Sequence, residues 1–485
     1  MIVIEVKKMI TKYKKMSIQA KTAIWFTICS LVQKGISFIT IPIFTRIMST
    51  NDYGTYNLYL SWFQIFTIIT SLYLYYGVLN SAMIKYDKER DAFISSMQFL
   101  TTIISVIVLI LYILFHNSLN SIIGLSTPLM ILMFIQLTID PSKNFWFGKQ
   151  RFDYKYKKLI LVTLVQSLLN PFLGVLFVFL FENDTFGRIL SIVIVESLFC
   201  VPIMIYQYKK GRVLFSKKYW KFGAKMAIPL IPHYLSGMVL NQGDRIVISK
   251  IIDNSAVAIY SIAYSVGMIG QIFTSALINS YIPTFLKNLK AGHYQNSKYI
   301  INTLLSIVAF ISIVMSLFAP ELVSIFGNSE YSNAVYVIPP ISASLFFIFM
   351  YNVFAIPQFY YERTSFLMIS SVISAISNIV LNIIFVPVFG MIAAAYTTLF
   401  CYIIYSVGHF IISNLMLKKN NIDNFFDKKI IIALSILVVL LNLLIVTIYK
   451  QMILRYTIIL SIIIICYFYK RRLSLLIRNL NQSSN

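Results

Sequence analysis

The stretch from Lys21 to Tyr56, KTAIWFTICSLVQKGISFITIPIFTRIMSTNDYGTY, decides the fold. Its first part is an apolar run of about 20 residues, which is long enough to cross a bilayer as a helix, and Lys34 lies near the middle of that run. A charged side chain at that depth costs several kcal/mol unless it faces water or a partner. We therefore expect this helix to line a water-accessible cavity, with Lys34 on the cavity side.

The composition of the rest of the chain indicates an all-α integral membrane protein. Of its 485 residues, 58% are hydrophobic and 12% are charged, which is too apolar for an ordinary soluble protein. The apolar runs have helical length and lack the alternation of a transmembrane barrel. They predict fourteen transmembrane helices, at about 22–45, 56–79, 93–115, 122–142, 159–181, 187–206, 226–249, 257–286, 299–319, 334–356, 365–386, 389–413, 430–449 and 453–469.

The positions of the charges orient these helices in the membrane. The net charge is +24, and most of the 41 Lys and Arg residues lie in short loops on alternate sides of the apolar runs. This is the positive-inside pattern, so nucleic acid is not the partner that the charge indicates. The bias holds along the whole chain when both termini are cytoplasmic, which favours fourteen helices over thirteen or fifteen.

A weak internal repeat predicts two halves. The Ala20-Lys21 pair corresponds to Ala224-Lys225, Tyr56 to Tyr260, and, in a second alignment, Asn170 to Asn382. Six helices per half make the repeat parallel, with a pseudo-two-fold axis along the membrane normal. We predict a cytoplasmic segment (1–21), an N-lobe (22–206), a cytoplasmic loop (207–225), a C-lobe (226–413), a second cytoplasmic loop (414–429), two added helices (430–469) and a cytoplasmic tail (470–485).

Polar side chains recur at helical spacing in the first two helices of each half and form the candidate binding site. We expect a cationic lining from Lys34, Arg46, Arg245 and Lys250, with hydrogen-bonding neighbours Gln33, Ser37, Asn241 and Gln271. Two other interpretations stay open. Polar uncharged residues often only join membrane helices, and basic residues near helix ends can extend to the interface.

Three acidic residues lie within the predicted spans. Glu196, near the centre of its helix, either binds a coupling cation or proton, or is a protonated side chain hydrogen-bonded between helices. Asp244 is a second candidate for ion coupling, with a structural ion pair to another helix as the alternative. Asp140, close to Lys143, is expected at the cytoplasmic rim.

The sequence carries no catalytic signal. It lacks a carboxylate pair, a nucleophile elbow, a phosphate-binding glycine loop and a nucleotide motif. The four cysteines lie in separate predicted helices without metal-ligand spacing, so we predict neither a disulfide nor a metal site. We expect a protein that is not an enzyme, has no cofactor, and is driven by Na⁺, H⁺ or the membrane potential.

The phrase Pro42–Tyr56, PIFTRIMSTNDYGTY, together with Pro229-Leu230-Ile231-Pro232, Asp244-Arg245 and Tyr260-Ser261-Ile262-Ala263, resembles the Wzx-type polysaccharide-biosynthesis flippases. These belong to the multidrug/oligosaccharidyl-lipid/polysaccharide (MOP) exporter superfamily. The resemblance implies two six-helix lobes arranged as a V in the bacterial plasma membrane.

The same resemblance implies a function. The chain would move an undecaprenyl-pyrophosphate-linked oligosaccharide, a repeat unit of O-antigen, capsule or exopolysaccharide, to the outer leaflet by alternating access. Lys34 and Arg245, then Arg46, would hold the pyrophosphate. The implied partners are this lipid-linked glycan, membrane lipids and other polysaccharide-assembly proteins.

Three rival functions are compatible with a polytopic membrane protein. A multidrug or organic-cation antiporter of the same superfamily would need an acidic cavity, for which Glu196 and Asp244 are candidates. A glycan polymerase or ligase would be expected to carry catalytic residues in a large external loop, and the predicted external loops are short. A scaffolding protein would leave the charge of Lys34 unexplained.

Overall fold

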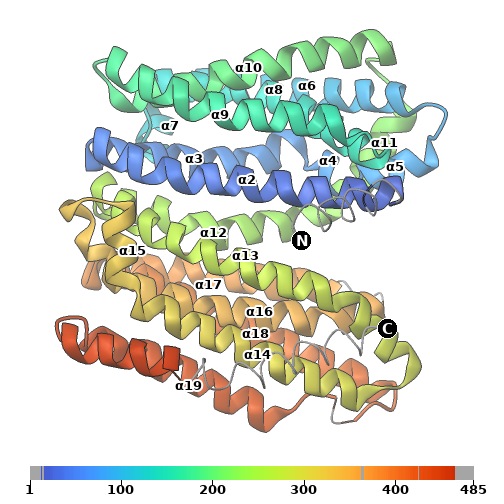
Figure 1. The fold of residues 1–485 in the computed structure, drawn as a ribbon. Coiled ribbons are helices and arrows are strands. Elements are labelled where there is room, and N and C mark those ends of the chain that lie inside the picture. Colours follow the sequence, from blue (N-terminus) through green and yellow to red (C-terminus); the bar gives the residue numbers. More distant parts are fainter. Residues whose placement is uncertain (1–12, 14–15, 362–364, 424, 465–485) are drawn as a thin grey trace, which may run out of the picture. The chain divides into compact units, whose positions relative to one another are not determined.

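The computed structural model describes residues 13, 16–361, 365–423 and 425–464, and this part of the chain is helical without strands. The chain divides into two compact units, Met1–Leu235 and Ser236–Asn485 (Figure 1). The predicted all-helical class is confirmed. The two six-helix lobes, their symmetry axis and the V shape stay predictions.

Unit 1 is built from helices that follow one another through short turns. They are α2 (Ile18–Ile47), α3 (Thr50–Ser71), α4 (Leu74–Gly77), α5 (Leu79–Lys85), α6 (Arg90–Leu114), α7 (His116–Ile123), α8 (Thr127–Phe152), α9 (Tyr156–Leu180), α10 (Asp184–Gly211), α11 (Lys217–Ala227), the 3₁₀ turn η1 (Ile228–Leu230) and the start of α12 (Ile231–Ile251).

Unit 2 contains the remainder of α12 and the helices that follow it. They are α13 (Asn254–Ala291), α14 (Tyr294–Leu317), α15 (Ala319–Phe326), η2 (Ser329–Tyr336), α16 (Ile338–Tyr360), α17 (Ser365–Phe389), α18 (Met391–Lys419), α19 (Lys428–Thr447) and a short apolar helix, Met452–Ile464. Helix α16 is the centre of this unit, because 83% of its most apolar window is buried.

Ten helices in the described part of the chain are long and apolar enough to cross a membrane, or eleven if the bent pair α7 and α8 is one span. Three further predicted segments correspond to α3, α12 and Met452–Ile464, which do not meet that criterion. The multi-pass membrane class is therefore supported, and the count of fourteen stays a prediction. The end of the last predicted segment, 465–469, lies outside the described residues.

The second predicted span, 56–79, is interrupted in the structure. Helix α3 ends at Ser71, and the next two residues, Leu72 and Tyr73, have φ of 46° and 52°. Each non-glycine residue in this left-handed region costs about 1–3 kcal/mol, which surrounding contacts must offset. The Tyr73 ring stacks on Tyr76 with centroids 4.9 Å apart, and its edge meets Tyr234 at 5.0 Å. A cluster of tyrosine rings thus supports the break.

The family-like phrase after α2 has a local structural role. Ser49 caps α3, because its hydroxyl accepts a hydrogen bond from the backbone N–H of Asp52 at 3.0 Å. The Asp52 carboxylate also accepts a hydrogen bond from the Thr185 hydroxyl at 2.7 Å, which links the α2–α3 turn to the start of α10. This part of the motif therefore builds the fold of unit 1.

Helices α8 and α10 are joined by buried hydrogen bonds. Pro141 has no N–H for the carbonyl of Leu137, and the Ser105 hydroxyl of α6 donates to that carbonyl instead, at 3.4 Å. Ser142 donates to the Cys200 carbonyl at 2.9 Å, and Gln207 donates to the Ser142 carbonyl at 2.9 Å. These bonds fix the register in which α8 and α10 present their charged residues.

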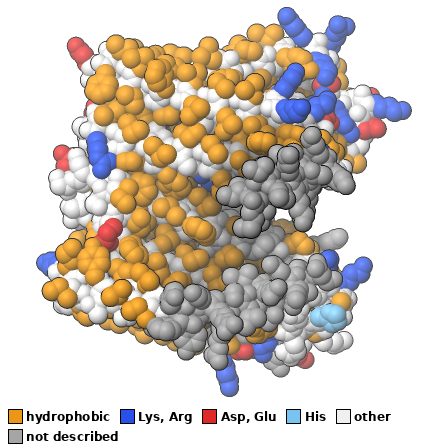
Figure 2. Space-filling model, in the orientation of Figure 1, with side chains coloured by type: hydrophobic (Ala, Val, Ile, Leu, Met, Phe, Trp, Pro, Cys, Tyr) orange, Lys and Arg blue, Asp and Glu red, His pale blue; other side chains and the backbone are white. Residues whose placement is uncertain are grey.

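Basic side chains gather at one end of unit 1, near α5 and α11, while hydrophobic side chains cover most of the face shown (Figure 2). At the helix ends, Lys149 of α8 and Lys210 of α10 both form ion pairs with Asp91 of α6. Nearby, the Tyr219 hydroxyl and Lys218 hold the pKa of Glu89 below its ordinary value. This gathering agrees with the positive-inside pattern of the sequence.

Close packing of α9 against α10 gives a stability prediction. A Cβ on Gly187 would lie 2.4 Å from the carbonyl oxygen of Phe177, so Gly187→Ala would force the two backbones apart. We expect a loss of about 1–3 kcal/mol, measured as a lower melting temperature of the purified protein in detergent. The matched control is Gly35→Ala, where nothing lies within 4 Å and the change should be neutral or slightly stabilising. Equal melting temperatures for both variants would contradict the close approach.

Candidate functional site

The polar group around Lys34 is exposed on α2. Gln33, Lys34 and Ser37 are all exposed, whereas Cys29 and Thr40 of the same helix are buried. Lys34 forms no ion pair with any residue in the described part of the chain. Because it is exposed and has no such ion pair, the Lys34 ammonium is available to an anionic ligand or to water.

The other exposed candidates lie near helix ends. Arg46 is in the last turn of α2, where its guanidinium donates to the Pro42 carbonyl at 2.8 Å. Lys250 is exposed in the last turn of α12, and Gln271 is exposed on α13. Positive charges at helix C-termini also stabilise the helix dipole, so the position of Arg46 and Lys250 has a structural explanation as well.

Arg245 is buried, which differs from the open cavity position expected for it. Its side chain lies 4.5 Å from the centre of the Tyr264 ring and is 8% exposed as a residue. The guanidinium donates to the Ser261 hydroxyl at 3.0 Å and to the side-chain oxygen of Gln242 at 2.9 Å. Neutral acceptors and an aromatic face therefore hold this charge inside unit 2.

Asp244 is the most deeply buried acidic group of unit 2, with 0% exposure. Its carboxylate accepts hydrogen bonds from Asn382 and Thr398, each at 2.7 Å, and from the Tyr260 hydroxyl. The expected alternative of a structural ion pair is not seen among the described residues, since Asn382, Thr398 and Tyr260 are neutral. The carboxylate is thus solvated by a polar shell from α13, α17 and α18.

The shell around Asp244 is rich in oxygen ligands. Asn378 donates to Thr398 at 2.9 Å, and its side-chain oxygen accepts from Asn382 at 3.3 Å. Asn241 lies on the same helix as Asp244 and accepts a hydrogen bond from Tyr402 at 3.4 Å. Carboxylate, amide and hydroxyl oxygens are the ligands that hard cations prefer, so this cluster has the donor chemistry for one.

Glu196 lies in a charged cluster of unit 1 that sequence reasoning only partly identified. Lys143 of α8 is 3.3 Å from the Glu196 carboxylate and 3.2 Å from Asp140. The side chains of Asp140 and Lys143 are 12% and 13% exposed, so both are mostly buried, and the cytoplasmic rim position of Asp140 stays a prediction. The i, i+3 spacing of Asp140 and Lys143 in the sequence indicates that these two side chains can pair. The sequence gives no sign that Glu196 approaches them from another helix.

Arg188, near the start of α10, is a buried cation that the sequence analysis did not single out, and it is 5% exposed. Its guanidinium lies over the rings of Phe44 and Tyr56, at 4.2 and 5.2 Å from their centres. It donates to the Ser191 hydroxyl at 3.2 Å. Unit 1 therefore holds a cation among aromatic and neutral groups, in the same way that unit 2 holds Arg245.

Within the described ranges, no group of three or more His, Cys, Asp or Glu side chains could hold a metal ion. Cys29, Cys200 and Cys401 are free and buried, and Cys466 lies outside the described residues. The oxygen cluster around Asp244 is a different type of site, since most of its ligands are amides and hydroxyls.

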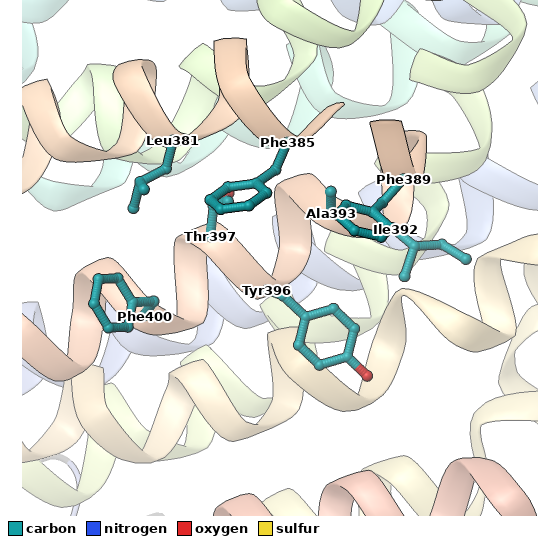
Figure 3. A pocket seen from close by; sticks show the side chains of 8 residues that line it. All are labelled: Leu381, Phe385, Phe389, Ile392, Ala393, Tyr396, Thr397 and Phe400. Carbon is teal, nitrogen blue, oxygen red and sulfur yellow. The ribbon is translucent and has the colours of Figure 1, made fainter. Parts of the chain in front are cut away.

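A pocket of about 710 Å³ lies between α17 and α18 (Figure 3). Its walls are almost entirely apolar, formed by Leu381, Phe385, Phe389, Ile392, Ala393, Tyr396, Thr397 and Phe400. Thr397 of α18 is a polar residue of this wall. Its hydroxyl donates to the side chain of Asn382, which belongs to the Asp244 shell. Such a pocket suits a hydrocarbon chain rather than a sugar.

Comparison with known proteins identifies the family. The family model described as polysaccharide biosynthesis protein matches residues 20–289, which is more than half of the chain. The chain belongs to the polysaccharide biosynthesis protein family. A second family model, MatE, matches residues 229–384. The resemblance to polysaccharide-biosynthesis members of the MOP superfamily, predicted from the sequence, is confirmed.

One curated relative and several solved structures agree with this assignment. The family member from Haemophilus influenzae named Lsg locus putative protein 1 is 22% identical over 279 residues, covering 56% of this chain and 66% of that relative. The lipid II flippase MurJ, in an inward closed conformation, has a TM-score of 0.70 at 15% identity, covering 93% of this chain and 100% of MurJ.

Two further solved structures share the fold less closely. An inward-facing MATE family multidrug resistance transporter has a TM-score of 0.63 at 14% identity, covering 81% of this chain and 96% of that one. A MOP superfamily transporter from Pyrococcus furiosus has a TM-score of 0.56 at 15% identity, with 83% and 96% covered. At these identities the likeness shows the fold of MOP transporters, and the family assignment rests on the sequence match.

The Asp244 shell gives a stability prediction for this family member. Thr398→Val removes one of the donors to a fully buried carboxylate, and we expect a loss of about 1–3 kcal/mol in thermal unfolding. In an Asp244→Asn background the same change should cost less, because no ionised group is left underpaired. Thr303→Val is the control, since that hydroxyl donates only within its own helix, to Tyr299 at 3.0 Å. A cost that is the same in both backgrounds would refute the coupling.

Proposed function

We propose that this chain is a flippase that moves an undecaprenyl-pyrophosphate-linked oligosaccharide from the cytoplasmic to the outer leaflet of the bacterial plasma membrane by alternating access. The observation that carries the proposal is Lys34, an exposed cation in the middle of a long apolar helix, without an acidic partner among the described residues, in a member of a polysaccharide-biosynthesis family. The family match supports the glycan pathway, and the fold supports transport.

The physical chemistry of the substrate requires such a cation. A pyrophosphate and a polar glycan cannot cross about 30 Å of hydrocarbon without groups that replace their water. Lys34 would supply charge for the pyrophosphate, while its exposed neighbours Gln33 and Ser37 would supply hydrogen bonds. A flexible ammonium group suits a diphosphate whose position changes during transport.

The other cations predicted for the binding site, Arg46, Lys250 and Arg245, differ in how exposed they are. Arg46 and Lys250 are exposed in their own units and remain candidate cations, and Asn241 and Gln271 remain candidate polar residues of unit 2. Arg245 is buried and fully engaged by neighbours, so a direct contact with pyrophosphate would require its side chain to leave Ser261 and Tyr264. We therefore rank it below Lys34.

We further propose that transport is coupled to a monovalent cation, Na⁺, held at Asp244. The carboxylate and the side-chain oxygens of Asn378, Asn382 and Thr398 form an oxygen-rich shell in unit 2. Asn382 donates through its amide nitrogen here, and rotation of that amide would present its oxygen to a cation. The cation would neutralise the buried carboxylate at the same time.

A MATE-like antiporter of multidrugs or organic cations is the second candidate. It is favoured by the MatE match over residues 229–384, by the buried Asp244 and by Glu196, whose side chain is 13% exposed. The exposed Lys34 would repel a cationic drug, which is why the flippase is preferred. Partners among other polysaccharide-assembly proteins belong to the proposal as well.

The first functional prediction concerns Lys34. Lys34→Ala should abolish export of surface glycan while the protein still inserts in the membrane, because the phosphate loses its counter-charge. Lys34→Arg should keep partial activity, since the charge is retained. Surface glycan and membrane-inserted protein are measured in the same cells, with Lys158→Ala, an exposed lysine at the start of α9, as the control.

The outcomes for Lys34 separate two roles. Normal glycan export by Lys34→Ala would remove this site from the proposal. If Lys34→Arg is as inactive as Lys34→Ala, then a lysine that exchanges a proton explains the data better than an electrostatic contact, because arginine does not deprotonate in this range.

The second functional prediction concerns Asp244. In proteoliposomes at one fixed pH, a Na⁺ gradient should accelerate glycan transport by the unaltered protein, and Asp244→Asn should remove that acceleration because it removes the charge that holds the cation. Asp87→Asn, an exposed residue between α5 and α6, should retain it. Transport by Asp244→Asn that still follows the Na⁺ gradient would refute the cation site.

A further inference from the structure

Unit 1 contains a buried cluster of two acids and one base. Lys143 of α8 is 3.2 Å from Asp140 and 3.3 Å from Glu196 of α10. The three side chains are only 12–13% exposed, so all of them lie mostly within the helix bundle. With both acids ionised and the lysine protonated, the cluster would carry one negative charge in excess.

The hydrogen bonds show where that excess charge lies. Both oxygens of Asp140 have partners: Oδ1 lies beside Lys143, and Oδ2 accepts from Asn144 at 2.6 Å. Glu196 uses Oε1 for Lys143, whereas its Oε2 is buried without a hydrogen-bond partner among the described residues. The Gln136 side chain faces Glu196, and a neutral amide replaces only part of the water that an ionised oxygen loses in such a position.

The groups that face the cluster do not supply a second positive charge. From α3 comes Tyr59, whose hydroxyl donates to the Gln136 side chain at 2.8 Å, and from α10 comes Cys200. Tyr73 and Tyr75, at and after the break that follows α3, face Asp140. Phenols and thiols are neutral near pH 7. None of these facing groups therefore adds a positive charge to that of Lys143.

We propose that Glu196 binds a proton on Oε2 and is a proton-binding site of unit 1. A proton from the aqueous phase forms an O–H bond with Oε2, which brings the cluster to zero net charge and leaves Lys143 paired with Asp140. Release of the proton restores an ionised Glu196 that competes with Asp140 for Lys143. The Lys143 ammonium can therefore be arranged in two ways between the two carboxylates, and the binding of a single proton decides between them.

This site would couple transport to protons. The coupling role rests on the proposed function, whereas the binding of a proton by Glu196 does not depend on it. It also differs from the Asp244 shell, where three neutral donors already solvate the carboxylate.

Infrared spectroscopy of the purified full chain tests proton binding directly. A protonated carboxyl has a carbonyl stretch that is separate from the bands of carboxylates and amides and that shifts in D₂O. We expect the unaltered protein to show this band near neutral pH and Glu196→Gln to lose it. Glu182→Gln, an exposed glutamate before α10, is the matched control and should retain it. A band of equal intensity in Glu196→Gln would overturn the proposal.

A second variant tests the reason for protonation. Asp140→Asn removes one negative charge, so Glu196 should ionise beside Lys143 and the band should weaken or vanish although Glu196 is intact. Because glutamine resembles a protonated glutamate in shape and charge, the Glu196→Gln variant should fold. The Asp140→Asn variant tests the protonation of Glu196 independently. An undiminished band in Asp140→Asn would contradict the charge balance.

Transport measurements connect the site to function. In proteoliposomes with a pH gradient and no Na⁺ gradient, glycan transport should depend on the gradient in the unaltered protein and become independent of it in Glu196→Gln. Dependence that persists in Glu196→Gln would overturn the coupling role. Unaltered protein that shows the carboxyl band but moves no lipid-linked glycan would overturn the proposed function and leave the proton site standing.

Discussion

The cost of a charge in hydrocarbon is the constraint on which this structure depends. The chain meets it in three ways. Lys34 stays exposed on α2, Arg188 and Asp244 are surrounded by neutral hydrogen-bonding groups, and Lys143 is shared by two carboxylates. The second and third arrangements reduce the cost by local dipoles and by opposite charges, whereas Lys34 is left outside the packed interior. The third leaves one negative charge in excess when all three side chains are charged.

Much of the fold could be predicted because the signal is local. Runs of apolar residues require helices in a membrane, where every backbone group must be satisfied within its own segment. The break after α3 was missed because Leu72 and Tyr73 carry none of the usual signs of a turn, such as glycine or proline. Tyrosine rings from distant parts of unit 1 stabilise it, and sequence spacing does not reveal such contacts.

The candidate site could be predicted only in part, for the same reason. Lys34, Glu196 and Asp244 were recognised because each is a polar residue in an apolar run. The burial of Arg245 and the approach of Glu196 to Lys143 depend on helix packing, which the sequence does not encode at any fixed spacing. A charged residue in a span can thus be found from the sequence, whereas its partner must come from the structure.

The repeat gives the buried charges a common logic. It equates Tyr56 with Tyr260 and Asn170 with Asn382, and in each unit these positions surround one buried charge. In unit 1 the charge is Arg188, which donates to the Tyr56 hydroxyl and to the Asn170 carbonyl, each at 3.5 Å. In unit 2 it is Asp244, which accepts from Tyr260 and from Asn382. The Asn170 acceptor is its backbone carbonyl, whereas Asn382 donates through its side-chain amide, so the tyrosine is the residue whose side chain acts in both units. A tyrosine hydroxyl can donate or accept, and it therefore solvates a buried cation in unit 1 and a buried anion in unit 2.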